Sequence, residues 1–191
     1  RLVDELEPLF TFREMTYRAL GAHARDVKPE QVEALSKSFK KLLERVYIDQ
    51  LTAHMVKTDN PYSVEDIVIT NSELRGIFAR INSVAKIKKN SDNAEIQMNY
   101  RMVKRDGAWR IYDIEIEGIS LIDNYRSQFN EVLTNHPFDY LLGSIEKHVA
   151  DLDKNPAANP IEEITDAKEA KEATAKTDPP AEKKSQASGK K

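Results

Sequence analysis

The chain has four histidines, the side chains best suited to bind a metal ion or to transfer protons near neutral pH. They are His23, His54, His136 and His148. A zinc pair on a helix needs two histidines three or four residues apart, and no two of these have that spacing. The chain also has no cysteine, which excludes thiolate metal sites, disulfide bonds and cysteine nucleophiles. The sequence therefore predicts no metal site.

The segment Gly118-Ile119-Ser120 matches the first half of the nucleophile elbow found in serine hydrolases. The second glycine of that motif is missing, because position 122 is an isoleucine. A serine placed before the first turn of a helix is also a common N-cap, which would explain Ser120 without catalysis. We predict a structural serine and no catalytic residue in this segment.

Three carboxylates, Asp113, Glu115 and Glu117, alternate along one predicted strand and would lie about 7 Å apart. Three interpretations are open. The carboxylates could form a solvated strand face. Asp113 could instead be a buried structural acid paired with an arginine, or a general base in a cone-shaped fold of the steroid-isomerase type.

An apolar row, formed by Ile96, Met98, Tyr100 and Met102, alternates with polar residues along another predicted strand. Methionine fills irregular space and suits surfaces that adapt to variable ligands. The row is therefore either part of an ordinary core or the wall of a cavity, and the residues alone leave both readings open.

Composition and charge limit the class of protein. The formal net charge of −3 leaves no excess of basic residues to neutralise phosphates, so we expect no sequence-independent binding of nucleic acid. No apolar run is long enough to span a bilayer. Residues 151–191 have no aromatic residue and hold four of the eight prolines. We predict one domain at 1–150 and a disordered, low-complexity tail at 151–191.

The apolar periodicity predicts helices first, then strands, then helices. Thr11 with Glu14 has the spacing of a capping box, and Gly21 would end that helix. A long helix is expected from Pro29 to about His54. Strands are expected at 64–70, 77–88, 94–104 and 109–116, with a hairpin turn at 106–107 and helices at 120–133 and 138–149. This order predicts an α+β fold in which a curved antiparallel four-stranded sheet closes over the long helix.

Residues 109–129 contain three consecutive motifs, Trp-x-x-Tyr-Asp, Glu-Gly-Ile-Ser-Leu and Asn-Tyr-Arg-Ser-Gln-Phe. This stretch resembles the MlaC, or toluene-tolerance, family of periplasmic phospholipid-binding proteins. Further matches are Glu-Pro-Leu-Phe at 7–10, Ala-Leu-Gly at 19–21 and Pro-Glu-Gln at 29–31, so the resemblance covers about residues 2–150. Ile119 replaces the usual valine, and residues 60–75 diverge.

The resemblance implies a nuclear transport factor 2-like fold enclosing an apolar pocket for phospholipid. It implies a non-enzymatic carrier without a cofactor, located in the periplasm. Such a carrier shuttles lipid between an outer-membrane lipoprotein complex and an inner-membrane ABC transporter that bears an MCE-domain protein, and so maintains outer-membrane lipid asymmetry. The family's signal peptide and first helix would then be missing before Arg1.

With a pocket implied, the apolar row becomes a candidate lipid-binding wall. We expect residues of the long helix and of the fourth strand to form the opposing walls. The candidate lipid-binding residues are Leu43, Val46, Tyr47, Ile96, Met98, Tyr100, Met102, Ile114 and Ile116. Two alternatives stay open, namely a cone-fold enzyme acting on a small apolar substrate and a lipid-free interaction module.

Overall fold

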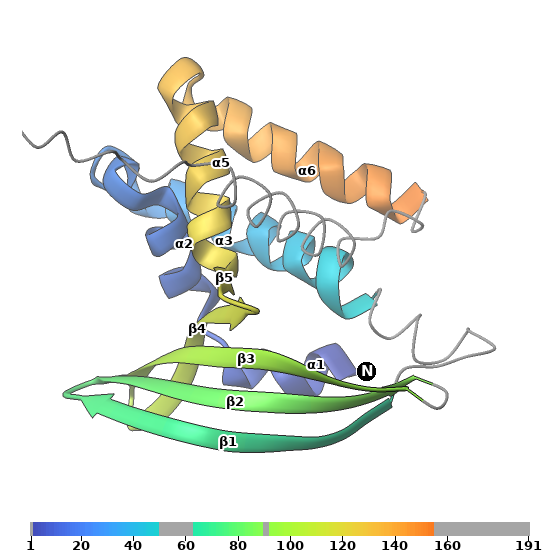
Figure 1. Ribbon diagram of the computed structural model, residues 1–191. Coiled ribbons are helices and arrows are strands. Elements are labelled where there is room, and N and C mark those ends of the chain that lie inside the picture. The colour runs from blue at the N-terminus through green and yellow to red at the C-terminus, as the bar shows by residue number, and fades with distance from the viewer. Residues whose placement is uncertain (1, 50–62, 90–91, 155–191) are drawn as a thin grey trace, which may run out of the picture. The chain divides into compact units, whose positions relative to one another are not determined.

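The structure is a computed structural model that describes residues 2–49, 63–89 and 92–154 (Figure 1). These residues belong to one compact unit, Arg1–Ala158. The elements are α1 (Leu2–Leu6), η1 (Glu7–Leu9), α2 (Phe12–Leu20), η2 (Gly21–Arg25), α3 (Pro29–Leu43), η3 (Glu44–Asp49), β1 (Ser63–Arg75), β2 (Phe78–Lys89), β3 (Asp92–Arg105), β4 (Ala108–Ile116), β5 (Ile119–Ser120), α5 (Leu121–Asn135) and α6 (Phe138–Lys154). The predicted α+β class is confirmed.

The long helix begins where the sequence predicts it, at Pro29. The Gln31 side chain reaches back and accepts a hydrogen bond from the backbone N–H of Lys28 at 3.1 Å. The chain stays helical to Asp49, but the last six residues form a π-helix, which apolar periodicity does not reveal. The predicted final turn, 50–54, lies outside the described residues.

The predicted capping box of α2 is wrong, although its helix and its end are confirmed. Thr11 is the N-cap residue, but its side chain makes no capping hydrogen bond. The Glu14 carboxylate instead pairs with Arg18 at 2.9 Å and with Arg105 of β3 at 3.2 Å. Gly21 ends the helix with a φ of 57°, a conformation in which a side chain would be strained.

The helices α2, α3, α5 and α6 pack against one another around one core. Its centre is Phe39 of α3, which is fully buried and makes edge contacts with the rings of Tyr125 at 4.8 Å and Phe129 at 5.3 Å. We call the following set the helical core: Met15, Ala19, Leu20, Val32, Leu35, Phe39, Leu42, Leu43, Val46, Ile122, Tyr125, Phe129, Leu141, Ile145 and Leu152.

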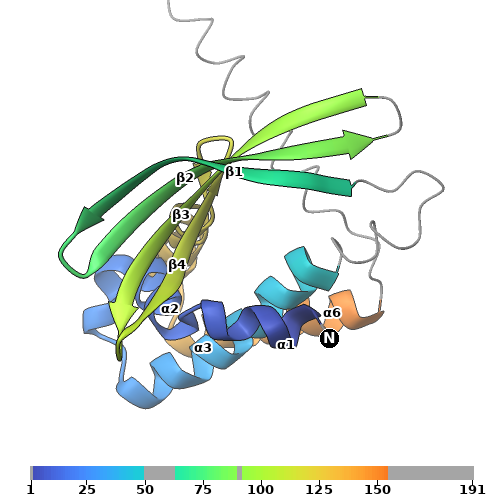
Figure 2. The same cartoon turned by 90° about the horizontal axis from the view of Figure 1, so that it is seen from below.

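The strands form one antiparallel sheet in the order β1-β2-β3-β4-β5. The sheet has five strands rather than the predicted four, because the two-residue strand β5 folds back on the end of β4. The predicted hairpin turn is confirmed, since Asp106 and Gly107 both have positive φ angles, 49° and 79°. Figure 2 shows that the long strands are strongly curved, as predicted.

The sheet is fixed to the helices through β4. Phe10 forms a parallel bridge with Ile111, and the N–H of Thr11 donates to the Ile111 carbonyl at 2.9 Å. The Arg18 guanidinium of α2 lies over the ring of Tyr112 at 3.8 Å and near the ring of Phe78 at 5.6 Å. Residues 10–11 and helix α2 thus both contact β4. β1 lies at the opposite edge of the sheet and makes none of these contacts.

The last helix extends further than the predicted domain boundary at residue 150. α6 runs to Lys154, so four residues predicted as tail are helical. Leu152 belongs to the helical core and is 7% exposed, and Asp153 pairs with Arg45 of η3 at 2.6 Å. Residues 155–191 lie outside the described residues, and their predicted disorder stays a prediction.

We expect a chain ended after Lys154 to unfold at the same temperature as the full chain, because residues 155–191 have too little apolar surface to form a core. A chain ended after residue 150 should lose about 2 kcal/mol of unfolding free energy, because it lacks the buried Leu152 side chain. Thermal unfolding followed by circular dichroism measures both. Equal stability of the two truncated chains would contradict this assignment.

Candidate functional site

One face of the sheet is almost entirely apolar. The strand register shows this, because Tyr100 lies between Ile81 and Ile114 while Met98 lies between Ser83 and Ile116. We call this surface the apolar sheet face. It comprises Val64, Ile67, Ile69 and Leu74 of β1, Ala79, Ile81, Ala85 and Ile87 of β2, Ile96, Met98, Tyr100 and Met102 of β3, and Ile114 and Ile116 of β4, with Ser72 and Ser83 among them.

Two register shifts in β1 keep four of its aliphatic side chains on this face, while Val68 lies on the other. They leave Glu65 and Thr70 without a paired residue in the register with β2, although the Glu65 side chain contacts Lys88 and the Thr70 hydroxyl donates to the Asn82 carbonyl. Without an extra residue at each point, the side-chain alternation would carry part of the strand to the other face. With them, Ile67 lies opposite Ala85 and Leu74 opposite Ala79.

Exposure of the apolar sheet face is highest on β1, the strand at the edge of the sheet. Ala85 at the centre is 1% exposed, and the members on β3 and β4 from Ile96 onward are half-buried. On β1, Ile67 is 51%, Ile69 65% and Leu74 69% exposed. Large contiguous apolar surfaces that remain open to solvent usually mark a binding site for a ligand or partner.

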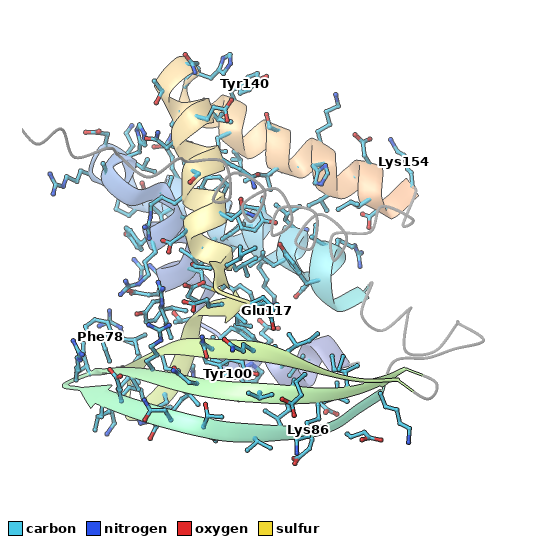
Figure 3. All side chains as sticks on the ribbon, in the orientation of Figure 1. Phe78, Lys86, Tyr100, Glu117, Tyr140 and Lys154 are labelled. Atoms are coloured by element: carbon cyan, nitrogen blue, oxygen red, sulfur yellow. The ribbon has the colours of Figure 1, made fainter. Side chains whose placement is uncertain are left out.

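The structure brings together six of the nine predicted site residues. Ile96, Met98, Tyr100 and Met102 lie in one row on β3, beside Ile114 and Ile116 of β4, and all six are half-buried. Figure 3 labels Tyr100 within the sheet. The part of the site on the sheet is thus one continuous surface.

The three predicted residues of the long helix lie elsewhere. Leu43 and Val46 belong to the helical core, where they are 6% and 8% exposed, and Tyr47 packs against that core. Their role as a wall opposite the sheet stays a prediction.

Sequence analysis missed the apolar residues of β1 and β2, of which Ile67, Ile69, Leu74, Ile81 and Ile87 are the largest. The shifts in β1 interrupt the alternation of its side chains, so no single period covers the strand. A usable signal was the concentration of aliphatic residues in both strands, without regard to their period.

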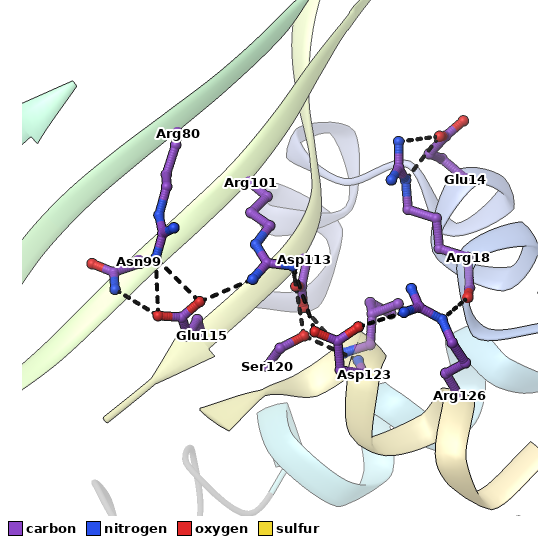
Figure 4. Close-up of polar contacts among 11 residues, drawn as sticks. Glu14, Arg18, Arg80, Asn99, Arg101, Asp113, Glu115, Ser120, Asp123 and Arg126 are labelled. Carbon is purple, nitrogen blue, oxygen red and sulfur yellow. Dashed lines mark hydrogen bonds and ion pairs between the residues drawn. The ribbon is translucent and has the colours of Figure 1, made fainter. Parts of the chain in front are cut away.

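The opposite side of the sheet carries a cluster around Glu115 (Figure 4). We call this side the polar sheet face; its polar members include Asp66, Glu73, Arg80, Lys86, Asn99, Arg101, Asp113 and Glu115, and Val68, Val84 and Val103 lie among them. The Glu115 carboxylate accepts hydrogen bonds from Arg80 at 3.1 Å, Arg101 at 3.1 Å and Asn99 at 3.0 Å. Glu115 is 9% and Asp113 1% exposed, so the interpretation of these carboxylates as a solvated strand face is wrong.

Asp113 joins the sheet to the start of α5. Its carboxylate accepts from the Ser120 hydroxyl at 2.7 Å and from the Ile122 N–H at 3.0 Å, and it pairs with Arg101 at 3.3 Å. Burial raises the pKa of Asp113, although these three partners oppose the shift. Burial lowers the pKa of Arg101, but its carboxylate neighbours more than compensate and raise it. The geometry agrees with the interpretation of Asp113 as a buried structural acid paired with an arginine.

Ser120 is the N-cap of α5, as predicted, and its hydroxyl accepts a hydrogen bond from the Asp123 N–H at 3.0 Å. The same hydroxyl donates to Asp113. Both hydrogen-bonding functions of the serine are therefore used in joining β4 to α5.

Within residues 2–49, 63–89 and 92–154, no three histidine or acidic side chains gather in a group that could hold a metal ion. His23 contacts the Asn130 side chain at 3.0 Å, and His136 stacks on Tyr140 with ring centroids 4.0 Å apart. His54 lies outside the described residues, and the absence of a metal site stays a prediction. No helix in the described part is both long and apolar enough to cross a bilayer.

The sequence model of the MlaC protein family matches residues 1–147. The chain belongs to the MlaC family. The apolar sheet face and the cluster around Glu115 are thus features of an MlaC-family domain.

Two relatives fit this membership. The intermembrane phospholipid transport system binding protein MlaC of Haemophilus influenzae is 23% identical over 146 residues, which are 75% of this chain and 64% of that protein. The chain thus spans slightly less than two-thirds of that relative's length. The solved structure of a phospholipid-binding protein from Ralstonia solanacearum, in complex with a phospholipid, has a TM-score of 0.61 and 23% identity, covering 80% of this chain and 83% of that chain. This likeness shows that the two share a fold.

Proposed function

We propose that this MlaC-family chain is a phospholipid-binding protein of an intermembrane phospholipid transport system, and that the apolar sheet face holds the acyl chains. The observation that carries the proposal is the large apolar surface on one side of the sheet, whose members lie outside the helical core and are mostly half-buried or exposed. The names of the two relatives support the class of ligand.

The physical chemistry of lipid transfer requires such a surface. Exposing each buried CH₂ group to water costs about 0.8 kcal/mol, so a chain of about 16 carbons costs on the order of 12 kcal/mol to expose. A carrier must therefore provide an apolar surface in place of the bilayer. The row from Ile96 to Met102, with Ile114 and Ile116, supplies the half-buried part of that surface.

We further propose that the polar head group lies near solvent and is bound with little selectivity. The members of the apolar sheet face are uncharged, and the charged residues that share its side in the register, Lys104 at one end and Lys89 with Asp92 at the other, lie at the strand ends. Arg80 and Arg101, two half-buried cations of the sheet, lie on the polar sheet face and both bind Glu115. They support the fold there instead of binding a phosphate.

The wider role follows the family resemblance. We propose a periplasmic carrier that exchanges lipid with an inner-membrane ABC transporter bearing an MCE-domain protein and with an outer-membrane lipoprotein complex. In this proposal, Leu43, Val46 and Tyr47 lie opposite the sheet in the lipid-bound protein. The chain binds its cargo and does not transform it, and it needs no cofactor.

The protein purified from a bacterial host should carry glycerophospholipid with little head-group preference, because its apolar sheet face offers acyl chains a surface without charged groups. Organic extraction followed by lipid mass spectrometry measures this, with an unrelated protein of similar size as the control.

Lipid content no higher than that of the control would contradict the proposal. An enzyme would convert a small apolar substrate, and an interaction module would carry no ligand at all. Native mass spectrometry of the same sample distinguishes these outcomes.

A further inference from the structure

Two hairpins meet at one end of the sheet. The turn at 76–77 joins β1 to β2, and the turn at 106–107 joins β3 to β4. Phe78 pairs with Val103 in the register, and the Lys104 N–H donates to the Ile77 carbonyl at 2.8 Å, so both hairpins lie at the same end of the sheet (Figure 2). We call residues 73–78 and 103–110 the hairpin end.

The hairpin end exposes large apolar side chains to solvent. Leu74 is 69%, Ile77 48% and Phe78 39% exposed. Trp109, the single tryptophan of the chain, is half-buried in the same region. A Cβ added at Gly76 would meet no atom within 4 Å apart from those of its chain neighbours, so the first turn projects away from the described part of the protein. Such projecting apolar side chains usually mark a surface that binds something.

Basic residues outnumber acids at the hairpin end, although the chain as a whole has a net charge of −3. Two residues of α2 contact the hairpin end, since Glu14 pairs with Arg105 and Arg18 lies near the Phe78 ring. With these two included, the region has five basic residues and three acids, namely Arg18, Arg75, Lys104, Arg105 and Arg110 against Glu14, Glu73 and Asp106.

Ion pairs within the protein neutralise only part of this positive charge. Arg75 pairs with Glu73 at 3.4 Å. Glu14 is shared by two cations, Arg18 at 2.9 Å and Arg105 at 3.2 Å. One carboxylate cannot neutralise two guanidinium groups, so this pairing leaves a net positive charge.

Two further cations have no acidic partner. Within the described residues, Lys104 and Arg110 have no carboxylate oxygen within 4.0 Å. The Arg110 guanidinium donates to the Trp109 carbonyl at 3.5 Å, and the Lys104 ammonium lies 6.0 Å from the centre of the Trp109 ring. Lysine and arginine beside a tryptophan are typical of surfaces that lie at the boundary between lipid head groups and acyl chains.

We propose that the hairpin end docks the protein on the surface of an anionic phospholipid bilayer. Leu74 and Ile77 enter the boundary between head groups and acyl chains, while Arg75, Lys104 and the neighbouring bases contact lipid phosphates. A bilayer accepts projecting apolar side chains without a matching surface, whereas a protein partner would have to supply one. This inference goes beyond the proposed function, since it concerns the membrane surface and not the lipid molecule held on the apolar sheet face.

The test uses the purified full chain and vesicles of about seven parts phosphatidylcholine to three parts phosphatidylglycerol. The protein should sediment with these vesicles and should bind pure phosphatidylcholine vesicles at least about tenfold more weakly, because anionic lipid attracts the bases. Because Trp109 is the single tryptophan, its emission reports on the hairpin end. The emission should shift to shorter wavelength on binding and return when high salt releases the protein.

A charge reversal makes the test specific. Arg75→Glu with Lys104→Glu should lower the affinity for anionic vesicles at least about tenfold. The matched control, Lys37→Glu with Lys147→Glu, places the same charge change on exposed positions of α3 and α6 and should leave the affinity unchanged. Ile77→Ser keeps the charge but removes an exposed apolar side chain, so it should weaken binding about fivefold. Arg75→Gln with Lys104→Gln serves if the reversed protein fails to fold.

Four results would overturn the proposal. They are no sedimentation with anionic vesicles at millimolar lipid, equal binding to neutral vesicles, an equal loss in the hairpin and control variants, or unchanged tryptophan emission in the vesicle-bound protein. The lipid content of the purified protein is measured on the same samples. A protein that docks but carries no lipid would contradict the proposed function alone, and a lipid-loaded protein that does not dock would contradict this inference alone.

Discussion

A Met98→Asp protein is expected to stay folded and to lose most of its phospholipid. Met98 is half-buried on the apolar sheet face and is not a member of the helical core. A carboxylate there can be hydrated once lipid has left, so the unfolding free energy should fall by only about 1 kcal/mol. A bound acyl chain would bury the same charge without a partner, so lipid content should drop about tenfold or more.

Circular dichroism and lipid quantification on one preparation measure the two effects, and Tyr100→Glu should behave in the same way. The contrasting control is Phe39→Asp, which puts the same charge at the centre of the helical core and should unfold the protein. Normal lipid content in a folded Met98→Asp protein would show that the cargo does not lie on this face. Unfolding of both sheet variants would show a filled core instead.

Replacing Asp113 by alanine should lower the unfolding free energy by about 3 kcal/mol. The change leaves the buried Ile122 N–H without its acceptor and removes the partner of the Ser120 hydroxyl. The change also removes one of the carboxylates that pair with Arg101. Because the Arg101 side chain is 32% exposed and still pairs with Glu115, the loss of unfolding free energy should be smaller than for a fully buried ion pair.

Chemical denaturation of the variant and the parent protein gives this difference. Glu131→Ala on the exposed side of α5 is the control and should change the unfolding free energy by less than about 0.5 kcal/mol. A loss equally small in Asp113→Ala would contradict the structural role of this carboxylate.

The part of the chain that sequence analysis described best is 109–129. The alternation of Ile114 and Ile116 with Asp113 and Glu115 marks β4, although a register shift at Tyr112 interrupts it, and Ser120 with Asp123 marks the start of α5. Each of these signals comes from residues a few positions apart in the sequence. Local backbone geometry relates such spacings directly to a strand or to the start of a helix, so both elements could be predicted. The two-residue strand β5 is too short to show any period.

Contacts between distant residues could not be predicted in the same way. Asp113 meets Arg101 because β3 and β4 pair in one particular register, with a shift beside Arg101. Nothing in either strand alone determines that register. The Glu14 side chain shows the same limit, since its spacing from Thr11 suits a cap but Arg105 of a distant hairpin binds it instead.

The candidate site was predicted in part. Six of its residues follow from the clear alternation in β3 and β4, which the structure places on one face. The contribution of β1 was hidden, because the register shift at Thr70 lies between Ile67 and Leu74, which are an odd number of positions apart and yet on the same face. The positions of Leu43 and Val46 depend on how the helices pack, and the sequence alone does not determine this.

The separation between the helical core and the apolar sheet face has an evolutionary consequence. The helices are packed around Phe39 without help from residues such as Met98 or Ile69. Substitutions among aliphatic residues on the sheet therefore change little of the folding free energy and are free to accumulate. Relatives can therefore diverge in the cargo they prefer while the fold is kept, and the aliphatic residues of the apolar sheet face should vary faster among relatives than those of the helical core.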